Sequence, residues 1–254
     1  MSKEPTKRFS DRVDNYVKYR PTYPIELITK LQEEGIIEKT STIADIGSGT
    51  GIFTKILLDS DYQVIGVEPN NEMREFAEEY LSNYSNFSSI AAPAENTTLE
   101  ENSADVITTA QAFHWFDREK ARKEFLRILK PNGYLVIIWN DRIRDKIPFP
   151  TAYNDLLKKY CLDHEVDNHY KITFDQITDF YGSTNVMVYT CENSQIFDYE
   201  GIKGRLLSSS YSPKENEPNF LPLIADLKTA FDNHQIKGKV KMEYNTKMHY
   251  GKMK

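Results

Sequence analysis

The sequence predicts an α/β fold in which a mixed, mostly parallel β-sheet is flanked by helices, and three observations lead to this prediction. Over residues 25–140, short apolar runs alternate with segments in which apolar residues recur at helical spacing, the pattern of consecutive βα units. The apolar run 43–46 passes through a glycine-rich turn directly into one of the helical segments. Two β-rich segments, 185–197 and 239–250, follow these units and fit an antiparallel end to the sheet.

Each element of the first half has its own signal. Strands are expected at 43–46, 63–68, 87–91, 106–110 and 134–140, and helices at 25–34, 52–58, 72–80 and 118–129. Gly35 ends the first helix and Asp117 caps the last. The near-continuous apolar run 134–140 suits a strand that is covered on both faces.

The second half is less regular. Insert helices are expected at 150–161, 174–181, 199–207 and 221–233. Residues 239–250 alternate apolar with charged side chains, which predicts a half-exposed strand at the edge of the sheet. All of this fits one domain over 1–254: an arm at 1–24, a ligand-binding half at 25–140, and an insert half at 141–254.

Composition excludes several classes of protein. The chain has 254 residues, of which 39% are hydrophobic, and a net charge of -6 with scattered lysines and arginines. No apolar run approaches the ~20 residues of a membrane helix, the start lacks the apolar segment of a signal peptide, and no basic stripe suits nucleic acid. Two cysteines give no disulfide framework. We therefore expect a cytoplasmic protein, monomeric or homodimeric, that acts on a small molecule without nucleic-acid or membrane partners.

The glycine turn indicates which nucleotide binds. Glycines fall at 47, 49 and 51, whereas Ile52 occupies the place of the third glycine of a dinucleotide fingerprint. A pyrophosphate is therefore disfavoured relative to adenosine with an uncharged linker to an amino-acid-like tail. Glu68 ends the next strand, about 20 residues on, where a ribose diol is held in such folds.

The pattern Asp45-x-Gly47-x-Gly49-x-Gly51, followed by Val67-Glu68, resembles the class I S-adenosylmethionine-dependent methyltransferases. The resemblance implies a Rossmann-like seven-stranded mixed sheet with an antiparallel last strand, an N-terminal helical lid and helical inserts. It also implies S-adenosylmethionine as cofactor and S-adenosylhomocysteine as product. The residues to which it assigns cofactor binding are Tyr19, Asp45, Gly47, Ser48, Gly49, Thr50, Gly51, Glu68, Pro69, Met73, Ala94, Glu95, Ala110 and Gln111.

Residues 110–116, which follow the fourth expected strand, indicate which kind of molecule accepts the methyl group. Ala110-Gln-Ala-Phe-His-Trp-Phe116 resembles the branch that includes trans-aconitate and quinone-pathway methyltransferases, and it lacks the Asn or acid of nucleobase N-methyltransferases. His114 is a candidate general base and Trp115 a candidate pocket wall. The alternative for His114 is a packing residue.

Further acceptor candidates lie in the arm and in the insert half. Arg20 could clamp the cofactor carboxylate or an anionic acceptor, or form a surface ion pair. Tyr16 is a second catalytic candidate, unless it only packs the arm. Tyr211 is a third catalytic candidate, and Arg205 and Tyr211 could orient a polar acceptor, the alternative being a capped helix end and turn.

Two other functions, a dehydrogenase and a cofactor sensor, and a metal site are the alternatives. A dehydrogenase is disfavoured by Ile52 and by the lack of a Tyr-x-x-x-Lys-like pair, and a non-catalytic cofactor sensor stays open. We expect no metal. Asn140-Asp141 lack companion acids, and the group His164, Glu165, Asp167 and His169 lies in a very polar segment typical of a solvated face.

Overall fold

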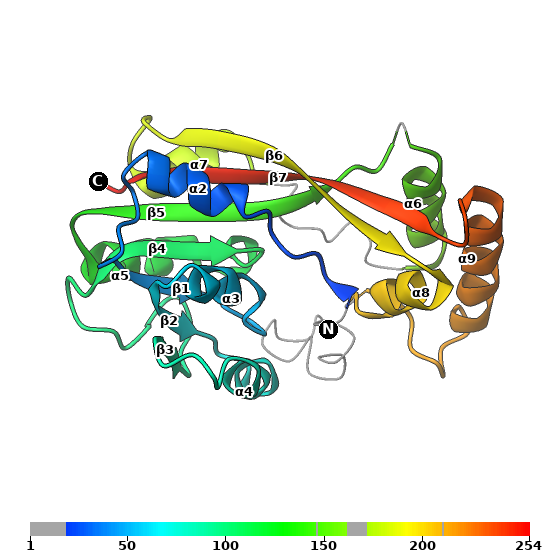
Figure 1. Cartoon of the computed structure of the whole chain (residues 1–254), viewed down its shortest axis with the longest axis horizontal. Coiled ribbons are helices and arrows are strands. Elements are labelled where there is room, and N and C mark those ends of the chain that lie inside the picture. The colour runs from blue at the N-terminus through cyan, green and yellow to red at the C-terminus, as the bar shows by residue number, and fades with distance from the viewer. Residues whose placement is uncertain (1–18, 146, 162–171, 210) are drawn as a thin grey trace.

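The computed structural model describes residues 19–145, 147–161, 172–209 and 211–254. Its centre is a seven-stranded sheet in the order β3-β2-β1-β4-β5-β7-β6 (Figure 1). The strands are β1 (Thr42–Ile46), β2 (Gln63–Val67), β3 (Phe87–Ile90), β4 (Ala104–Ala110), β5 (Leu129–Arg142), β6 (Met187–Phe197) and β7 (Val240–Lys252). Strands β1 to β5 are parallel, and β7 is antiparallel to both of its neighbours. The predicted Rossmann-like mixed sheet with an antiparallel last strand is therefore confirmed.

Helices cover both faces of this sheet. Their bounds are α2 (Glu26–Glu33), α3 (Ile52–Asp59), α4 (Asn71–Tyr80), α5 (Arg118–Ile128), α6 (Pro148–Tyr160), α7 (Phe174–Tyr181), α8 (Tyr199–Leu207) and α9 (Phe220–His234). Ile43 of β1 packs in the core shared with α2 and α3, whereas its neighbour Ala44 packs in the core shared with α5 and α7. The alternation arises because successive side chains of a strand point to opposite faces.

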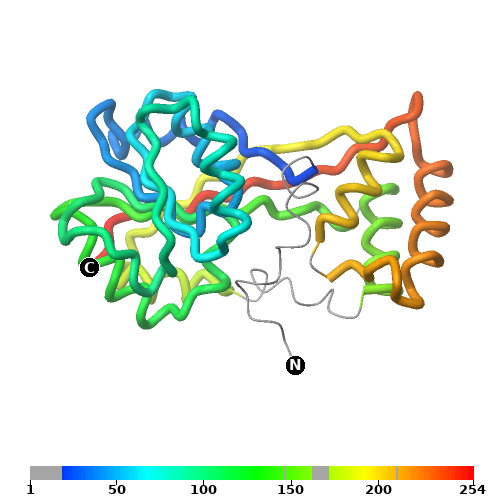
Figure 2. The backbone as a smooth tube through the Cα atoms, turned by 90° about the horizontal axis from the view of Figure 1, so that it is seen from below, coloured from blue at the N-terminus to red at the C-terminus, as the bar shows by residue number. Residues whose placement is uncertain are grey.

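A third core lies at the helical end of the molecule. Both views show α6, α8 and α9 gathered at one end, and the long strands β5, β6 and β7 connecting them to the rest of the sheet (Figures 1 and 2). Tyr153 of α6, Leu206 of α8, Leu227 of α9 and Met242 of β7 are all buried in this core. Helices α6, α8 and α9 thus pack on the extended ends of these strands.

One expectation about the sheet is wrong. Residues 239–250 were expected at an edge, but β7 lies inside the sheet between β5 and β6, and β6 is the edge strand. Met242 and Tyr244 of β7 are buried while Lys241 is exposed, so the alternating pattern is present. Such a pattern reports that one face of a strand is exposed, and it carries no information about whether the strand is paired on both edges.

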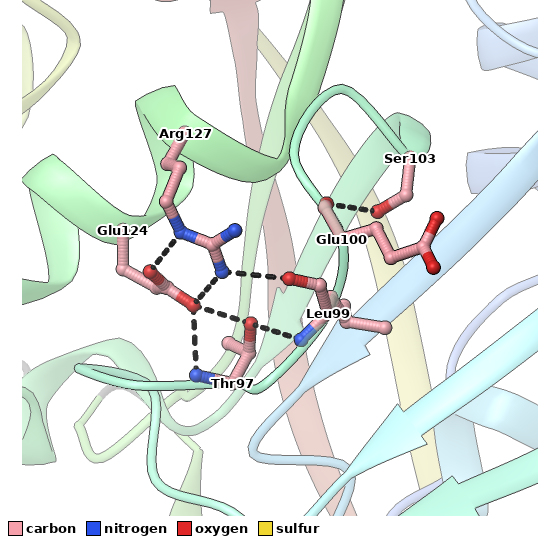
Figure 3. A network of polar contacts seen from close by, with 6 residues as sticks. All are labelled: Thr97, Leu99, Glu100, Ser103, Glu124 and Arg127. Carbon is pink, nitrogen blue, oxygen red and sulfur yellow. Dashed lines mark hydrogen bonds and ion pairs between the residues drawn. The ribbon is translucent and has the colours of Figure 1, made fainter.

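A buried polar network ties the loop after β3 to α5 (Figure 3). Glu124 accepts hydrogen bonds from Thr97 N at 2.8 Å, Thr97 Oγ1 at 2.6 Å and Arg127 Nε at 2.8 Å. Arg127 Nη2 also donates to Leu99 O at 2.7 Å. The hydrogen bonds from Arg127 above all, and then those from Thr97, lower the pKa of Glu124 to about 2. The network thereby fixes the loop after β3, which includes residues 93–95.

Glu124→Gln should lower the free energy of unfolding by about 1–3 kcal/mol at pH 7, because a buried charge-assisted network loses its acceptor charge. The pKa of Glu124 lies below its unfolded value, so its contribution is complete above pH 4.5 and fades as the pH falls toward 2. Urea denaturation at several pH values measures this. Glu119→Gln removes an exposed partner of Lys123 and should change little, and an equal effect of the two substitutions would contradict the assignment.

Candidate cofactor and acceptor site

A cavity of about 330 Å³ opens where the carboxyl ends of β1, β2 and β4 meet, the place at which open α/β sheets bind ligands. It extends from the glycine loop to residues of β5, α8 and β7. Residues named from the sequence that line it are Arg20, Asp45, Gly47, Ser48, Gly49, Thr50, Glu68, Pro69, Met73, Ala94, Glu95, Ala110, Gln111, His114, Trp115, Arg205 and Tyr211. Separate stretches of sequence thus contribute to one site.

The glycine loop presents bare backbone to the cavity at Gly49. This residue has a φ of 57°, and a Cβ built on it would meet nothing within 4 Å. The space beside it is therefore open. Gly47 differs, because a Cβ there would lie 2.5 Å from Ala112 Cβ, so its glycine is needed for packing.

Glu68, the residue after β2, contacts the glycine loop through its side chain. Its Oε2 accepts a hydrogen bond from Gly49 N at 2.9 Å, and its Oε1 accepts one from Asn70 N at 2.8 Å. The side chain is buried, and this burial raises the pKa of Glu68 against the opposing effect of the two backbone donors. A carboxylate with remaining lone pairs thus lies directly beside open backbone, which suits a ligand diol.

Asp45 has a different task. Its Oδ2 accepts from Thr54 Oγ1 at 2.6 Å and its Oδ1 from Thr108 Oγ1 at 2.8 Å, which joins β1 to α3 and β4. Burial raises the pKa of Asp45 to about 6 even though both hydroxyls oppose the shift. Asp45 lines the cavity, and these contacts make it the support of the glycine loop.

Three further polar residues, Thr50, Asn70 and Glu95, line the cavity near the glycine loop. Thr50 is buried at 1% exposure, and its Oγ1 has no hydrogen-bond partner among the described residues. Asn70 caps α4 by accepting from Met73 N at 2.9 Å, which fixes Met73 at the cavity. Glu95 Oε1 accepts from Asp117 N at 2.7 Å, so the loop after β3 is anchored to the start of α5.

The aromatic segment after β4 forms a short 3-10 helix, Phe113–Trp115. Phe113 is fully buried, whereas His114 and Trp115 are half-buried and line the cavity with ring centroids 4.8 Å apart. His114 therefore stands where a base or hydrogen-bonding group could reach an acceptor.

The segment after Tyr19 is attached to the sheet through its backbone. Thr22 O accepts from Asn140 Nδ2 at 3.2 Å and from Asn193 Nδ2 at 2.8 Å. Arg20 Nη2 donates to Ser208 O at 3.2 Å, so this segment also contacts the end of α8. The attachment places Arg20 in the cavity wall.

Two of the expected cofactor residues do not line the cavity. Tyr19 packs against α8, where a Cβ on Gly204 would lie 2.0 Å from its Cε2. Gly51 is the N-cap of α3 at a φ of 80°, and a Cβ there would lie 2.8 Å from Leu81 Cδ1. Tyr16 and the group His164, Glu165, Asp167 and His169 lie outside the described residues.

Sequence reasoning missed several lining residues. The missed polar residues are Asn70, Asn140, Arg142, Arg144 and Tyr244. Arg142 is the last residue of β5, so the rule that ligands bind at the carboxyl ends of parallel strands could have found it. Tyr244 carries no such signal, because it lies within an antiparallel strand whose pairing only the fold reveals.

Comparisons with known proteins agree with this geometry. Residues 44–137 match the family model of a methyltransferase domain. An uncharacterised methyltransferase-like protein of Schizosaccharomyces pombe is 36% identical over 158 residues, 62% of this chain and 60% of that protein. A probable S-adenosylmethionine-dependent methyltransferase of Saccharomyces cerevisiae is 26% identical over 208 residues, 71% of each chain. The chain spans 60% of the length of the Schizosaccharomyces pombe relative.

Solved structures show the same fold. A proposed type II methyltransferase of Anaeromyxobacter dehalogenans superposes with a TM-score of 0.67 at 19% identity, covering 92% of this chain and 98% of that one. The YcgJ protein of Bacillus subtilis gives a TM-score of 0.57, also at 19% identity, covering 91% of this chain and 98% of that one. The sequence match over residues 44–137 and the shared fold together confirm the resemblance to the class I methyltransferases.

Proposed function

Because residues 44–137 match a methyltransferase domain, we propose that the chain transfers the methyl group of S-adenosylmethionine to a small-molecule acceptor. The observation that carries the proposal is the pairing of Gly49 with Glu68: open backbone next to a buried carboxylate 2.9 Å from the loop amide. When bound, the cofactor supplies a methyl group already activated by a positively charged sulfur.

The described residues fit this cofactor. Glu68 would accept hydrogen bonds from the ribose hydroxyls, and Met73 offers an apolar contact beside it. No helix in the described ranges is long and apolar enough to cross a membrane.

The chain's part in the reaction is alignment and exclusion of water. In direct displacement (SN2), a lone pair of the acceptor forms the bond to the methyl carbon while the carbon–sulfur bond breaks and leaves its electron pair on sulfur. Alignment of this kind supplies several kcal/mol, up to about 7–11 in favourable cases. A carboxylate acceptor needs no base, whereas a hydroxyl acceptor would give its proton to His114 and could be hydrogen-bonded by a tyrosine such as Tyr211. Cytoplasmic location and a monomeric or homodimeric state stay predictions from the sequence.

Purified protein should bind S-adenosylhomocysteine in isothermal titration calorimetry and should not bind NADH. This pair of ligands separates methyl transfer from the dehydrogenase hypothesis. Incubation of the full chain with S-adenosylmethionine and a metabolite extract should then release S-adenosylhomocysteine, which a mere sensor would not produce. If the protein bound neither S-adenosylmethionine nor S-adenosylhomocysteine, the proposed function would be refuted.

A further inference from the structure

The end of the cavity away from the glycine loop is built from two arginines and three tyrosines. We call Arg142, Tyr153, Arg205, Tyr211 and Tyr244 the arginine–tyrosine cluster; all but Tyr153 line the cavity. They come from β5, α6, the end of α8 and β7, the elements that meet at the helical end of the molecule (Figure 1). The guanidinium carbon of Arg142 lies 5.1 Å from the ring centroid of Tyr153, and Arg205 interacts electrostatically with all three tyrosines.

Arg205 is buried in an unusual setting. The residue is only 6% exposed, its Nη1 donates to Ser209 Oγ at 3.4 Å, and its Nε has no hydrogen-bond partner among the described residues. Within the described part of the chain no carboxylate forms an ion pair with Arg205, and its side chain is hydrogen-bonded to Tyr244, a neutral partner at pH 7. Burying a guanidinium without a counter-charge is unfavourable, because the lost hydration is not replaced by an opposite charge.

The acids that line the cavity do not offset this charge. Asp45, Glu68 and Glu95 belong to the glycine-loop end and to the loop after β3, and each accepts hydrogen bonds there from a hydroxyl or a backbone amide. A second observation comes from Tyr153, which is fully buried with a hydroxyl that also has no described partner. Among the described residues the cluster therefore holds two guanidinium groups and no carboxylate.

We propose that the arginine–tyrosine cluster binds an anionic group of the methyl acceptor, a carboxylate or a phosphate monoester, as an anchor. The inference rests on the proposed function and names the acceptor class for the same cavity. Guanidinium groups bind both anions through charge-assisted, often bidentate hydrogen bonds. Lone pairs engaged in such bonds are poor nucleophiles, so the methylated atom is a different group of the same molecule, oriented by the anchor toward the glycine-loop end.

Calorimetry on protein saturated with S-adenosylhomocysteine tests the anchor, with succinate, glycerol 3-phosphate and neutral succinamide as probes. Succinate or glycerol 3-phosphate should bind and succinamide should not, and the anion that binds distinguishes carboxylate from phosphate. Arg205→Gln should lower the affinity for the anion at least 10-fold. The affinity of this variant for S-adenosylhomocysteine should stay within about twofold of wild type. Arg118→Gln, the same change of charge at an exposed position of α5, should leave anion binding unchanged.

Circular dichroism checks that Arg205→Gln folds. Tyr211→Phe removes only one cavity hydroxyl and should lower the affinity for the anion about fivefold. This variant provides the test if Arg205→Gln is unstable. Binding of neither anion, equal binding of succinamide, or unchanged affinity in both variants would overturn the inference. Because S-adenosylhomocysteine binding is measured first, its loss would refute the proposed function itself, a separate outcome.

Discussion

Gly49→Val should abolish binding of S-adenosylmethionine and S-adenosylhomocysteine, raising the dissociation constant more than about 100-fold, or about 2.7 kcal/mol. Two causes act together. Gly49 has a φ of 57°, a conformation that a β-branched residue adopts only with strain, and its Cβ direction points into space that is open in this cavity. The added isopropyl group would occupy the volume that the proposed cofactor needs. Isothermal titration calorimetry with S-adenosylhomocysteine measures the change.

Gly238→Val is the matched control for this substitution. Gly238 has a φ of 74°, and a Cβ built on it also meets nothing within 4 Å, but it does not line the cavity. It should therefore carry a similar backbone strain and leave cofactor affinity as in wild type. If Gly49→Val bound S-adenosylhomocysteine within about threefold of wild type, the glycine loop would not be the cofactor cradle.

Glu68→Ala should weaken S-adenosylhomocysteine binding by about 1–3 kcal/mol, roughly 5- to 150-fold, as hydrogen bonds to a charged acceptor are lost. The side chain also accepts from Gly49 N and Asn70 N, so its removal releases two backbone donors at the cradle. Calorimetry on wild type and variant gives the difference in binding free energy.

A ligand variant isolates the ribose contribution. S-adenosylhomocysteine without the ribose 2′-hydroxyl should bind wild type more weakly than the parent compound, and Glu68→Ala should reduce this difference. Glu72→Ala, which removes an exposed acid from α4, should leave both affinities unchanged. An undiminished ribose effect in Glu68→Ala would show that Glu68 does not bind the sugar hydroxyls.

Local sequence signals predicted the strand–turn–helix unit around Gly49 because its parts are close in the chain. The strand at 43–46, the turn through Gly49 and the helix from Ile52 follow one another directly, and Glu68 ends the adjacent parallel strand. Helix ends were predictable for the same reason: Asp117 accepts from Lys120 N, and Asp198 accepts from Gly201 N at the start of α8. Apart from Glu68, which lies 19 positions from Gly49 on the adjacent strand, each of these features depends on residues within a few positions of one another.

The interior position of β7 and the full set of cavity arginines could not be predicted in this way. Arg20, Arg142, Arg144 and Arg205 all line one cavity, although more than half of the chain lies between the first and the last. No periodicity or spacing links them. Their proximity depends on the pairing of β5 with β7 and β7 with β6, and on the packing of α6 and α8 against the extensions of these strands.

The amino-acid sequence alone determined that this chain forms βα units and places bare backbone beside an acid at the end of the second strand. Short-range sterics and strand periodicity suffice for that, because glycine permits positive φ and alternate residues of a strand share a face. Only the tertiary structure decided what stands across the cavity from that backbone. Long-range strand pairing brings a buried arginine and its tyrosines there, and charge burial, a property of the folded molecule, makes an anion the ligand that fits.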